Sequence, residues 1–288
     1  MLIIGRRSAD RLTTTLMYLA ASFVVAGVLV MGAGLLIKSW PILETNGLSG
    51  LLFSSAWRPS QGEFGFFPFI MGTLWVTGIA ALIALPISIL TAVYLAEYAH
   101  PRVRSILKPF MDVLAGIPSV VFGVWGILVL AIGGFNIGFN VLTGGIVLAL
   151  MVVPVITSIA EESFRTVPNH VKEASLALGA TKWEMVKHVV LRSSLLGIVA
   201  AGVMGFSRAF GETLAVLMVV GNIARVPTNP LDPGYPLPAL IANNYGEMMS
   251  IPSYESALMF AALILFTVVV MFNAIARLVL TRLQERWA

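Results

Sequence analysis

Residues 207–216, with the sequence SRAFGETLAV, decide how many times this chain crosses a membrane. They lie within an apolar segment, about 194–220, that is long enough for one crossing. The stretch nevertheless carries two charged residues, Arg208 and Glu212. Because residues four apart share one face of a helix, the two side chains can form an ion pair there. If the bilayer tolerates this pair, the segment is a transmembrane helix.

The composition of the whole chain indicates a membrane protein. Of its 288 residues, 58% are hydrophobic and 11% are charged, and the mean hydropathy is +0.92. A soluble domain usually has about 25% charged residues, so this chain could not cover a water-exposed surface. Lipid is therefore the expected solvent for most of the protein.

Long uncharged runs predict the positions of the other crossings. They cover residues 12–37, 64–96, 113–160 and 256–276. A crossing needs about 20 apolar residues, so the third run has room for two and the others for one each. We expect IGGFNIGFN, residues 132–140, to separate those two, because glycine and asparagine favour turns. With 194–220, the sequence predicts an all-α membrane protein of about six transmembrane helices.

The basic residues predict the orientation of these helices. With the N and C termini both cytoplasmic, fourteen of the eighteen Lys and Arg face the cytoplasm: Arg6, Arg7, Arg11, Arg102, Arg104, Lys108, Arg165, Lys172, Lys182, Lys187, Arg192, Arg277, Arg282 and Arg286. Three lie outside and Arg208 lies within the membrane. This is a strong positive-inside bias. The formal charge of +4 therefore reflects membrane orientation, and we expect no nucleic-acid partner.

No linker or low-complexity tract divides the chain, so we predict a single transmembrane domain over residues 1–288. The uncharged run 12–37 is too long for a signal-peptide core and is expected to be the first transmembrane helix. Extracytoplasmic loops are predicted at 38–66 and 221–253, and one long cytoplasmic loop at 161–193. Prolines within later helices predict kinks at Pro86, Pro118 and Pro154.

The cytoplasmic loop carries strong local signals for two short helices. Pro168 can open the first helix, which can stop at Gly179. Thr181 and Glu184 have the spacing of a capping box and predict the start of the second. The first of these helices is rich in small apolar residues, which are unfavourable on a surface exposed to water. It either lies against lipid headgroups or docks into a partner protein.

This loop resembles the EAA loop in the permease subunits of binding-protein-dependent ABC importers. The family pattern is Glu-Ala-Ala, three residues, Gly, nine residues, then Ile-x-Leu-Pro. The positions that carry it here are Glu173, Ala174, Ser175, Gly179, Val189, Leu191 and Arg192. The spacing matches throughout. Ser175 replaces an alanine, Val189 an isoleucine, and Arg192 the proline that breaks the helix in that family.

Three other stretches narrow the resemblance to phosphate-importer permeases, of the PstC rather than the PstA type. They are FGFFPFIMGTLWVTGIAALIALPISILTAVYLAEY at 64–98, LAGIPSVVFGVWG at 114–126 and RAFGETLAV at 208–216. The likeness spans about residues 40–280. It implies the fold of a type I ABC importer permease, multi-pass in the lipid of the cytoplasmic (inner) membrane of a prokaryote.

The resemblance also implies partners. They are a second, PstA-like permease, a dimer of ATP-binding subunits that binds ATP and Mg²⁺, and an extracytoplasmic phosphate-binding protein. The residues expected to contact the ATPase are Glu173, Ala174, Ser175, Gly179 and Ala180.

Arg208 is the candidate centre of a translocation site. The planar guanidinium of arginine can meet two oxygens of a tetrahedral oxyanion at once. Glu212 would hold the guanidinium between substrates, and Ser207 or Thr213 could add hydroxyl donors. The alternative is that Arg208 and Glu212 only form a structural ion pair.

Other functions remain open at this point. The chain could be a permease for another oxyanion, such as sulfate or molybdate. It could also be a secondary transporter or channel that ATP does not drive, or a membrane scaffold.

The sequence also bears on catalysis and cofactors. It has no G-x-x-x-x-G-K-[ST] phosphate loop, so ATP hydrolysis is expected in a separate chain and this chain is not an enzyme. It has no cysteine, and His100, His170 and His188 are scattered. We therefore expect no metal and no cofactor bound by this chain.

Overall fold

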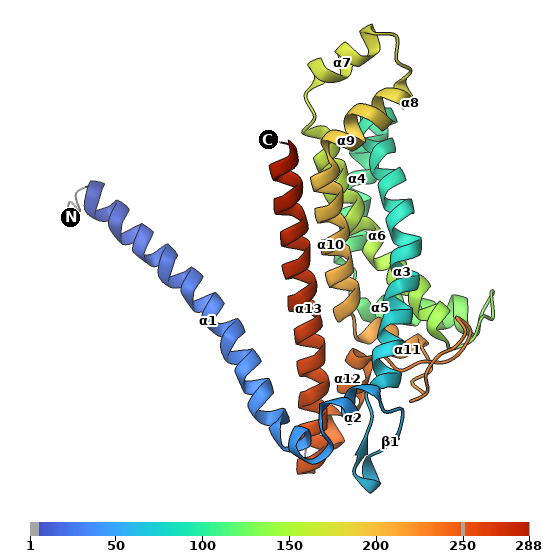
Figure 1. Cartoon of the computed structure of the whole chain (residues 1–288). Helices are drawn as coiled ribbons and strands as arrows, with labels where there is room; N and C mark the ends of the chain where they lie inside the picture. Colours follow the sequence, from blue (N-terminus) through green and yellow to red (C-terminus); the bar gives the residue numbers. More distant parts are fainter. Residues whose placement is uncertain (1–5, 249–250, 288) are drawn as a thin grey trace, which may run out of the picture.

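The described part of the chain folds mostly into helices, which confirms the predicted all-α class (Figure 1). A computed structural model describes residues 6–248 and 251–287. Residues 249 and 250 of the predicted outer loop and the ends of the predicted domain, 1–5 and 288, lie outside the described residues. The elements in chain order are α1 (Arg6–Asn46), α2 (Leu48–Phe53), β1 (Trp57–Arg58), η1 (Pro59–Gln61), β2 (Glu63–Phe64), α3 (Phe67–Val93), η2 (Tyr94–Tyr98), α4 (Pro101–Gly116), α5 (Ser119–Trp125), η3 (Gly126–Ala131), α6 (Val141–Arg165), α7 (Asn169–Ala177), α8 (Lys182–Met185), η4 (Val186–Val190), α9 (Leu191–Ser193), α10 (Leu195–Gly211), α11 (Leu214–Val219), α12 (Leu237–Met248) and α13 (Pro252–Trp287).

Four helices are each long and apolar enough to cross a membrane: α1, α3, α6 and α13. Two further crossings are bent. One joins α4 to α5 and η3 at 93°, and the other joins residues 182–193 to α10 at 70°. By length and composition, the described residues therefore contain four crossings, or up to six if each bent pair is one. The upper number agrees with the prediction, and the predicted turn at 132–140 separates η3 from α6.

The first bend lies at the predicted kink of Pro118. After α4 ends at Gly116, Ile117 and Pro118 are extended, with ψ of 133° and 137°. A proline disfavours the helical conformation of the residue before it, so the helix breaks rather than kinks. Pro86 and Pro154, by contrast, remain inside the continuous helices α3 and α6.

The second bend lies at Ser194. Its backbone is not helical, with φ −100° and ψ 13°, and its hydroxyl donates to the Ser163 carbonyl at 3.0 Å. The bend at the entry to α10 therefore exists although Arg192 stands where the importer family has proline.

The predicted crossing at 194–220 is not one continuous helix. α10 ends at Gly211, Glu212 is extended with φ −69° and ψ 127°, and α11 begins at Leu214. The expected placement of Arg208 and Glu212 on one helical face is therefore wrong, because Glu212 lies beyond the end of the helix. The charged motif marks a break in the crossing.

The two predicted outer loops are more ordered than expected. In the first, α1 continues to Asn46 and is followed by α2 and an antiparallel β1–β2 hairpin that pairs Trp57 with Phe64. The second contains α12. Aromatic side chains join the first loop to the helices, with the Trp57 ring centroid 4.7 Å from that of Phe69 and 6.1 Å from that of Tyr254.

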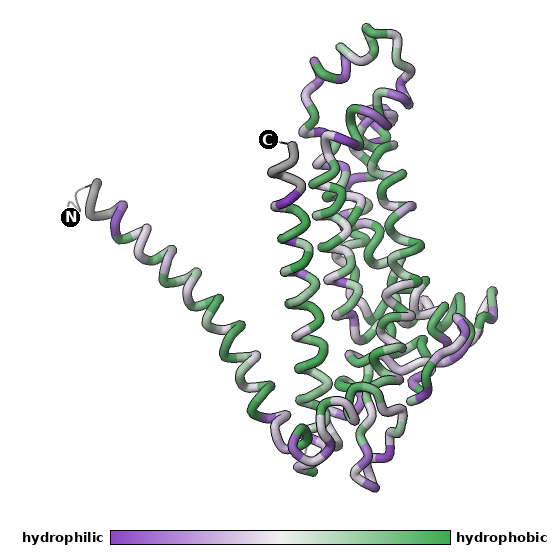
Figure 2. Tube along the Cα trace, in the orientation of Figure 1, coloured by the Kyte–Doolittle hydropathy of each residue, from purple (hydrophilic) through white to green (hydrophobic). Residues whose placement is uncertain are grey.

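The first part of α1 stands apart from the bundle (Figure 1). Residues 10–31 are exposed at every position, and hydrophobic residues predominate along them (Figure 2). Later in the helix, Gly32 lies against Phe266 of α13, where an added Cβ would be 3.0 Å from the ring. A helix that is apolar on all sides needs lipid or protein around it, so the cover for this part lies outside the chain.

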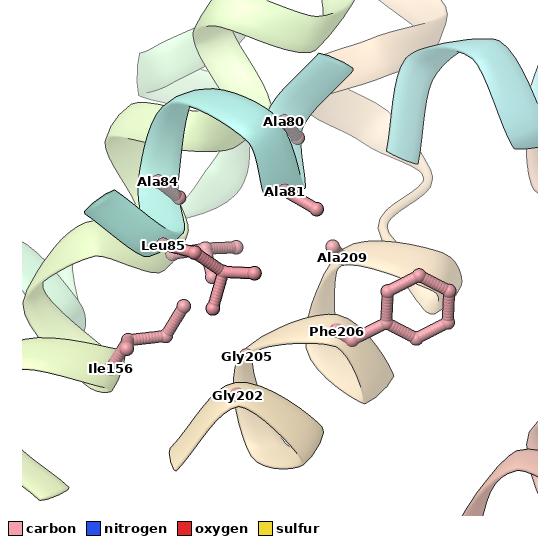
Figure 3. Close-up of a pocket in the computed structure, with 10 residues that line it drawn as sticks. Ala80, Ala81, Ala84, Leu85, Ile156, Gly202, Gly205, Phe206 and Ala209 are labelled. Atoms are coloured by element: carbon pink, nitrogen blue, oxygen red, sulfur yellow. The ribbon is translucent and has the colours of Figure 1, made fainter. Parts of the chain in front are cut away.

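Small residues let α3, α6 and α10 approach closely (Figure 3). Ala80 and Ala84 of α3, Gly205 of α10 and Ile156 of α6 are among the residues that line an apolar cavity of about 30 Å³. α3 and α6 also approach each other closely at Gly145. A Cβ added there would lie 2.5 Å from Cγ2 and 2.7 Å from Cβ of Ile79.

This contact predicts that Gly145→Ala destabilises the protein. The Cβ of Ile79 cannot move away without a shift of α3, and overpacking of this kind costs roughly 1–3 kcal/mol. Gly78→Ala is the matched control, because a Cβ added at Gly78, the neighbour of Ile79, meets nothing within 4 Å. We expect a lower apparent melting temperature for purified Gly145→Ala, and an unchanged or higher one for Gly78→Ala. Equal melting temperatures would contradict the close approach of the two helices.

Candidate functional site

Arg208 lies in the last turn of α10 and binds the broken end of α4. Its Nη2 donates to the Ala115 carbonyl at 3.1 Å. Ala115 is in the last turn of α4, whose final carbonyls have no partner within the helix. The guanidinium therefore sits at the negative end of the α4 dipole. It remains exposed on the surface of this subunit, where a second group could reach its other donors.

Glu212 contacts the end of a different helix, the start of α11. Its side chain is half-buried, and Oε1 accepts a long hydrogen bond, 3.4 Å, from the Ala215 backbone N–H at the start of α11. Within the part of the chain that the structure describes, no ion pair joins Glu212 to Arg208. The expected pair is thus replaced by two contacts, each of one charge with the end of a separate helix.

The two hydroxyls predicted for this site are both engaged elsewhere. Thr213 donates to the Gly211 carbonyl at 3.2 Å. Ser207 accepts from Nδ2 of Asn273 on α13 at 3.5 Å. Asn273 is therefore a polar neighbour of the motif that the sequence reasoning missed. The sequence did contain a signal for Asn273, because this polar residue interrupts the apolar run 256–276.

The predicted pair of short helices is present as α7 and α8. Pro168 precedes α7, and Gly179 adopts φ +88°, a conformation that favours glycine. The Gly179 N–H bonds the Leu176 carbonyl and the Ala180 N–H bonds the Ser175 carbonyl, which is a Schellman motif. The capping box of Thr181 and Glu184 then starts α8. The local signals for both helices are confirmed.

The segment with α7 and α8 projects from one end of the bundle (Figure 1). Glu173, Ala174 and Gly179 are exposed, and Ser175 and Ala180 are half-buried. Apolar side chains also face outward, above all Leu178, which is 90% exposed. Exposed apolar side chains on an ordered, projecting segment indicate a contact surface for another molecule.

A buried ion pair anchors this segment to the end of α3. Lys172 Nζ lies 2.5 Å from Oε1 of Glu97 in η2, and the two side chains are only 13% and 7% exposed. Lys182 adds a cation–π contact, 4.6 Å above the Tyr98 ring. The sequence reasoning missed this anchor, since no local pattern connects residues 75 positions apart.

The described residues contain no group of three or more His, Cys, Asp or Glu side chains that could hold a metal ion. Two of the scattered histidines have local partners instead. His100 Nδ1 accepts from the Arg102 N–H at the start of α4, and His188 Nδ1 is 3.1 Å from the Glu184 carbonyl.

A helical bundle with two bent crossings and a projecting pair of short helices is the architecture of a type I ABC importer permease. A chain of a bacterial ABC transporter involved in the import of the acidic polysaccharide alginate has the same fold, with a TM-score of 0.64 at 14% identity over 95% of this chain and 99% of that one. Residues 84–286 match the family described as "Binding-protein-dependent transport system inner membrane component", and the chain belongs to that family.

Curated relatives place the chain more finely. The phosphate transport system permease protein PstC of Xylella fastidiosa (strain Temecula1) is 35% identical over 96% of this chain and 92% of its own length. PstC of Mesorhizobium japonicum is 36% identical over 90% of this chain and 87% of its own. These names agree with the prediction of a transport subunit rather than an enzyme. The chain is therefore a multi-pass membrane permease of a prokaryotic type, and the predicted resemblance to importer permeases is confirmed.

Proposed function

We propose that this chain is the PstC-type permease subunit of an ATP-driven importer of inorganic phosphate. The observation that carries the proposal is Arg208, an arginine at the meeting point of broken transmembrane helices with donors left for an anion. Transporters bind substrates where membrane helices are discontinuous, because the freed polar groups can line a cavity there. The likeness to PstC proteins over nearly the whole chain supports phosphate as the anion.

In this proposal Arg208 binds the substrate and its neighbours tune that binding. The guanidinium exchanges part of its contact with the Ala115 carbonyl for two oxygens of the tetrahedral anion. Ser207 donates its hydroxyl to the anion while it still accepts from Asn273, and Thr213 donates when it leaves the Gly211 carbonyl. A phosphate that still carries a proton can donate to Glu212, which sulfate cannot do, so Glu212 favours phosphate over sulfate.

A second permease completes the site. A charged side chain exposed to the bilayer centre costs about 2.5–3.5 kcal/mol on insertion scales, so the exposed face of Arg208 needs a protein or aqueous surface opposite it. A PstA-like subunit is the proposed cover for Arg208. The pathway then runs between two permeases.

The segment of α7 and α8 couples this pathway to ATP hydrolysis. We assign the contact with a dimer of ATPase subunits, which bind ATP and Mg²⁺, to Glu173, Ala174, Ser175, Gly179 and Ala180. This orientation puts α7 and both termini in the cytoplasm. The opposite end, with α2 and α12, then faces the phosphate-binding protein outside the inner membrane. The loop 161–193 keeps its predicted coupling role, and 38–66 and 221–253 remain outside.

The test is phosphate uptake at low concentration by native cells that carry or lack this chain. We expect labelled phosphate to enter cells with the chain even in excess unlabelled sulfate or molybdate, and to enter poorly without it. Loss of sulfate or molybdate uptake in the deletion strain, with phosphate uptake intact, would assign the permease to another oxyanion. Uptake that continues when cellular ATP is depleted would instead favour a secondary transporter.

A further inference from the structure

A buried carboxylate, which lies nearer than Arg208 to the end of the bundle that carries α7, is surrounded by three basic side chains. Glu161 of α6 is 3% exposed. Its Oε1 lies 2.7 Å from Arg104 Nη2 and 3.8 Å from Arg165 Nη1, and its Oε2 lies 3.4 Å from Lys108 Nζ. Arg104 and Lys108 come from α4. One carboxylate against three cations leaves this cluster with a formal surplus of two positive charges.

The surplus charge faces outward from the bundle. The side chains of Arg104, Lys108 and Arg165 are 24%, 45% and 50% exposed, in contrast to the buried Glu161. A carboxylate that served only to pair two helices would need a single cation. The three cations, of which Arg104 is half-buried and Lys108 and Arg165 are more exposed, thus have donors to spare for a second anion.

Three buried polar atoms of the cluster also lack a hydrogen-bond partner among the described residues, and one of them is Oε1 of Glu161, which meets Arg104 and Arg165 only as ion pairs. Nε of Arg104 makes no hydrogen bond with any described residue. The same holds for the hydroxyl of Thr157, which lies one turn before Glu161 on the same face of α6. Buried donors without partners are rare, and a ligand or ordered water normally satisfies them.

The cluster lies on the same helix that Arg208 caps. Arg104 and Lys108 occupy one face of α4, and Ala115, the partner of Arg208, follows seven residues after Lys108. At 1.5 Å per residue this is a rise of about 10 Å. Positive charge therefore lies at two points along α4, at its broken end and nearer α7, with the carboxylate of Asp112 one turn after Lys108 between them.

We infer that Arg104, Lys108 and Arg165, held around Glu161, form a second site for a tetrahedral phosphate-type oxyanion. This inference rests on the proposed function, since it makes the cluster the exit site that receives the anion from Arg208. Glu161 competes with the anion for the same three cations. The site is therefore weak, as an exit site must be if the anion is to leave it.

The test uses the absence of cysteine from this chain, which makes one introduced thiol unique within it. The complete importer with Lys108→Cys is reconstituted in phosphatidylcholine vesicles, with partner chains free of reactive thiols. We expect phosphate uptake to fall roughly tenfold, because one charged donor is lost. Modification with aminoethyl methanethiosulfonate restores a lysine-like amine and should recover most of the uptake. Methyl methanethiosulfonate, which adds a neutral group, should recover no phosphate uptake. Recovery of uptake with both reagents would overturn a role for the charge.

Protection from modification identifies the ligand. Inorganic phosphate on both sides of the vesicle should slow the labelling of Lys108→Cys severalfold. It should not slow labelling of Arg102→Cys, an exposed residue of α4 without an ion pair to Glu161 among the described contacts. If anionic phosphatidylglycerol protects and phosphate does not, the cations hold a lipid headgroup and the exit role is overturned.

A second variant should strengthen phosphate binding at the cluster, whereas Lys108→Cys should weaken it. Glu161→Gln removes the competitor, so phosphate should protect Lys108→Cys at a lower concentration in that background. The same half-protecting concentration with and without Glu161→Gln would overturn the competition. Normal uptake by unmodified Lys108→Cys, together with no protection, would overturn the exit site alone. An importer of native sequence that takes up no phosphate would overturn the proposed function itself.

Discussion

Replacement of Arg208 by glutamine should lower phosphate uptake roughly 100-fold or more. The anion loses two charge-assisted hydrogen bonds, each worth about 1.5–3 kcal/mol, and about 1.4 kcal/mol corresponds to a factor of ten. Glutamine keeps a neutral amide donor at this position, but it is too short to reach the Ala115 carbonyl that Nη2 of Arg208 binds. The measurement is uptake of labelled phosphate by cells, with the amount of assembled complex in the membrane determined in parallel.

Two further variants interpret this result: one separates the charge of Arg208 from its geometry, and the other is a control for the loss of an exposed arginine. Arg208→Lys keeps the charge but loses the planar fork, so it should retain an intermediate rate. Arg102→Gln removes an exposed arginine from α4 and should transport at the normal rate. Near-normal uptake by Arg208→Gln in an assembled complex would reduce Arg208 to a structural cap for α4.

Replacement of Lys172 by methionine should detach the coupling segment. It leaves the Glu97 carboxylate, 7% exposed, without its cation, and breaking a buried ion pair in this way costs about 3–5 kcal/mol. We expect α7 to lose its fixed position, because this pair anchors it to the end of α3. The importer should then hydrolyse ATP with little phosphate uptake, and protease should cut between residues 166 and 181 more rapidly.

The double variant Glu97→Gln with Lys172→Met provides the control within the same site. It removes both charges, so it should regain most of the stability that Lys172→Met loses. Lys187→Met, at an exposed lysine of η4, should behave like the native chain. If Lys172→Met keeps full uptake and resists protease, the ion pair is not what holds α7 in place.

The membrane class and the order of crossings were predictable because they depend on the hydrophobicity of consecutive residues, added up along the chain. Uncharged runs of about 20 residues identify helices whatever their neighbours, and the glycines and asparagines at 132–140 mark a turn by themselves. The ends of α7 and α8 were predictable for a similar reason. Pro168, Gly179, Thr181 and Glu184 act on backbone groups within one turn of their own positions.

The long-range contacts of the charged residues followed from the tertiary structure alone. Arg208 was expected to pair with Glu212, four residues away, but it binds a carbonyl 93 residues earlier in the chain, because the backbone leaves the helix at Glu212. Glu161 gathers cations from α4, and Glu97 pairs with Lys172 across 75 residues. A charge pairs with whatever the folded chain brings within a few ångströms. The sequence by itself therefore determined which segments are helices and which residues carry charge, whereas the path of α4 past α6 and α10 decided what Glu161 and Arg208 bind.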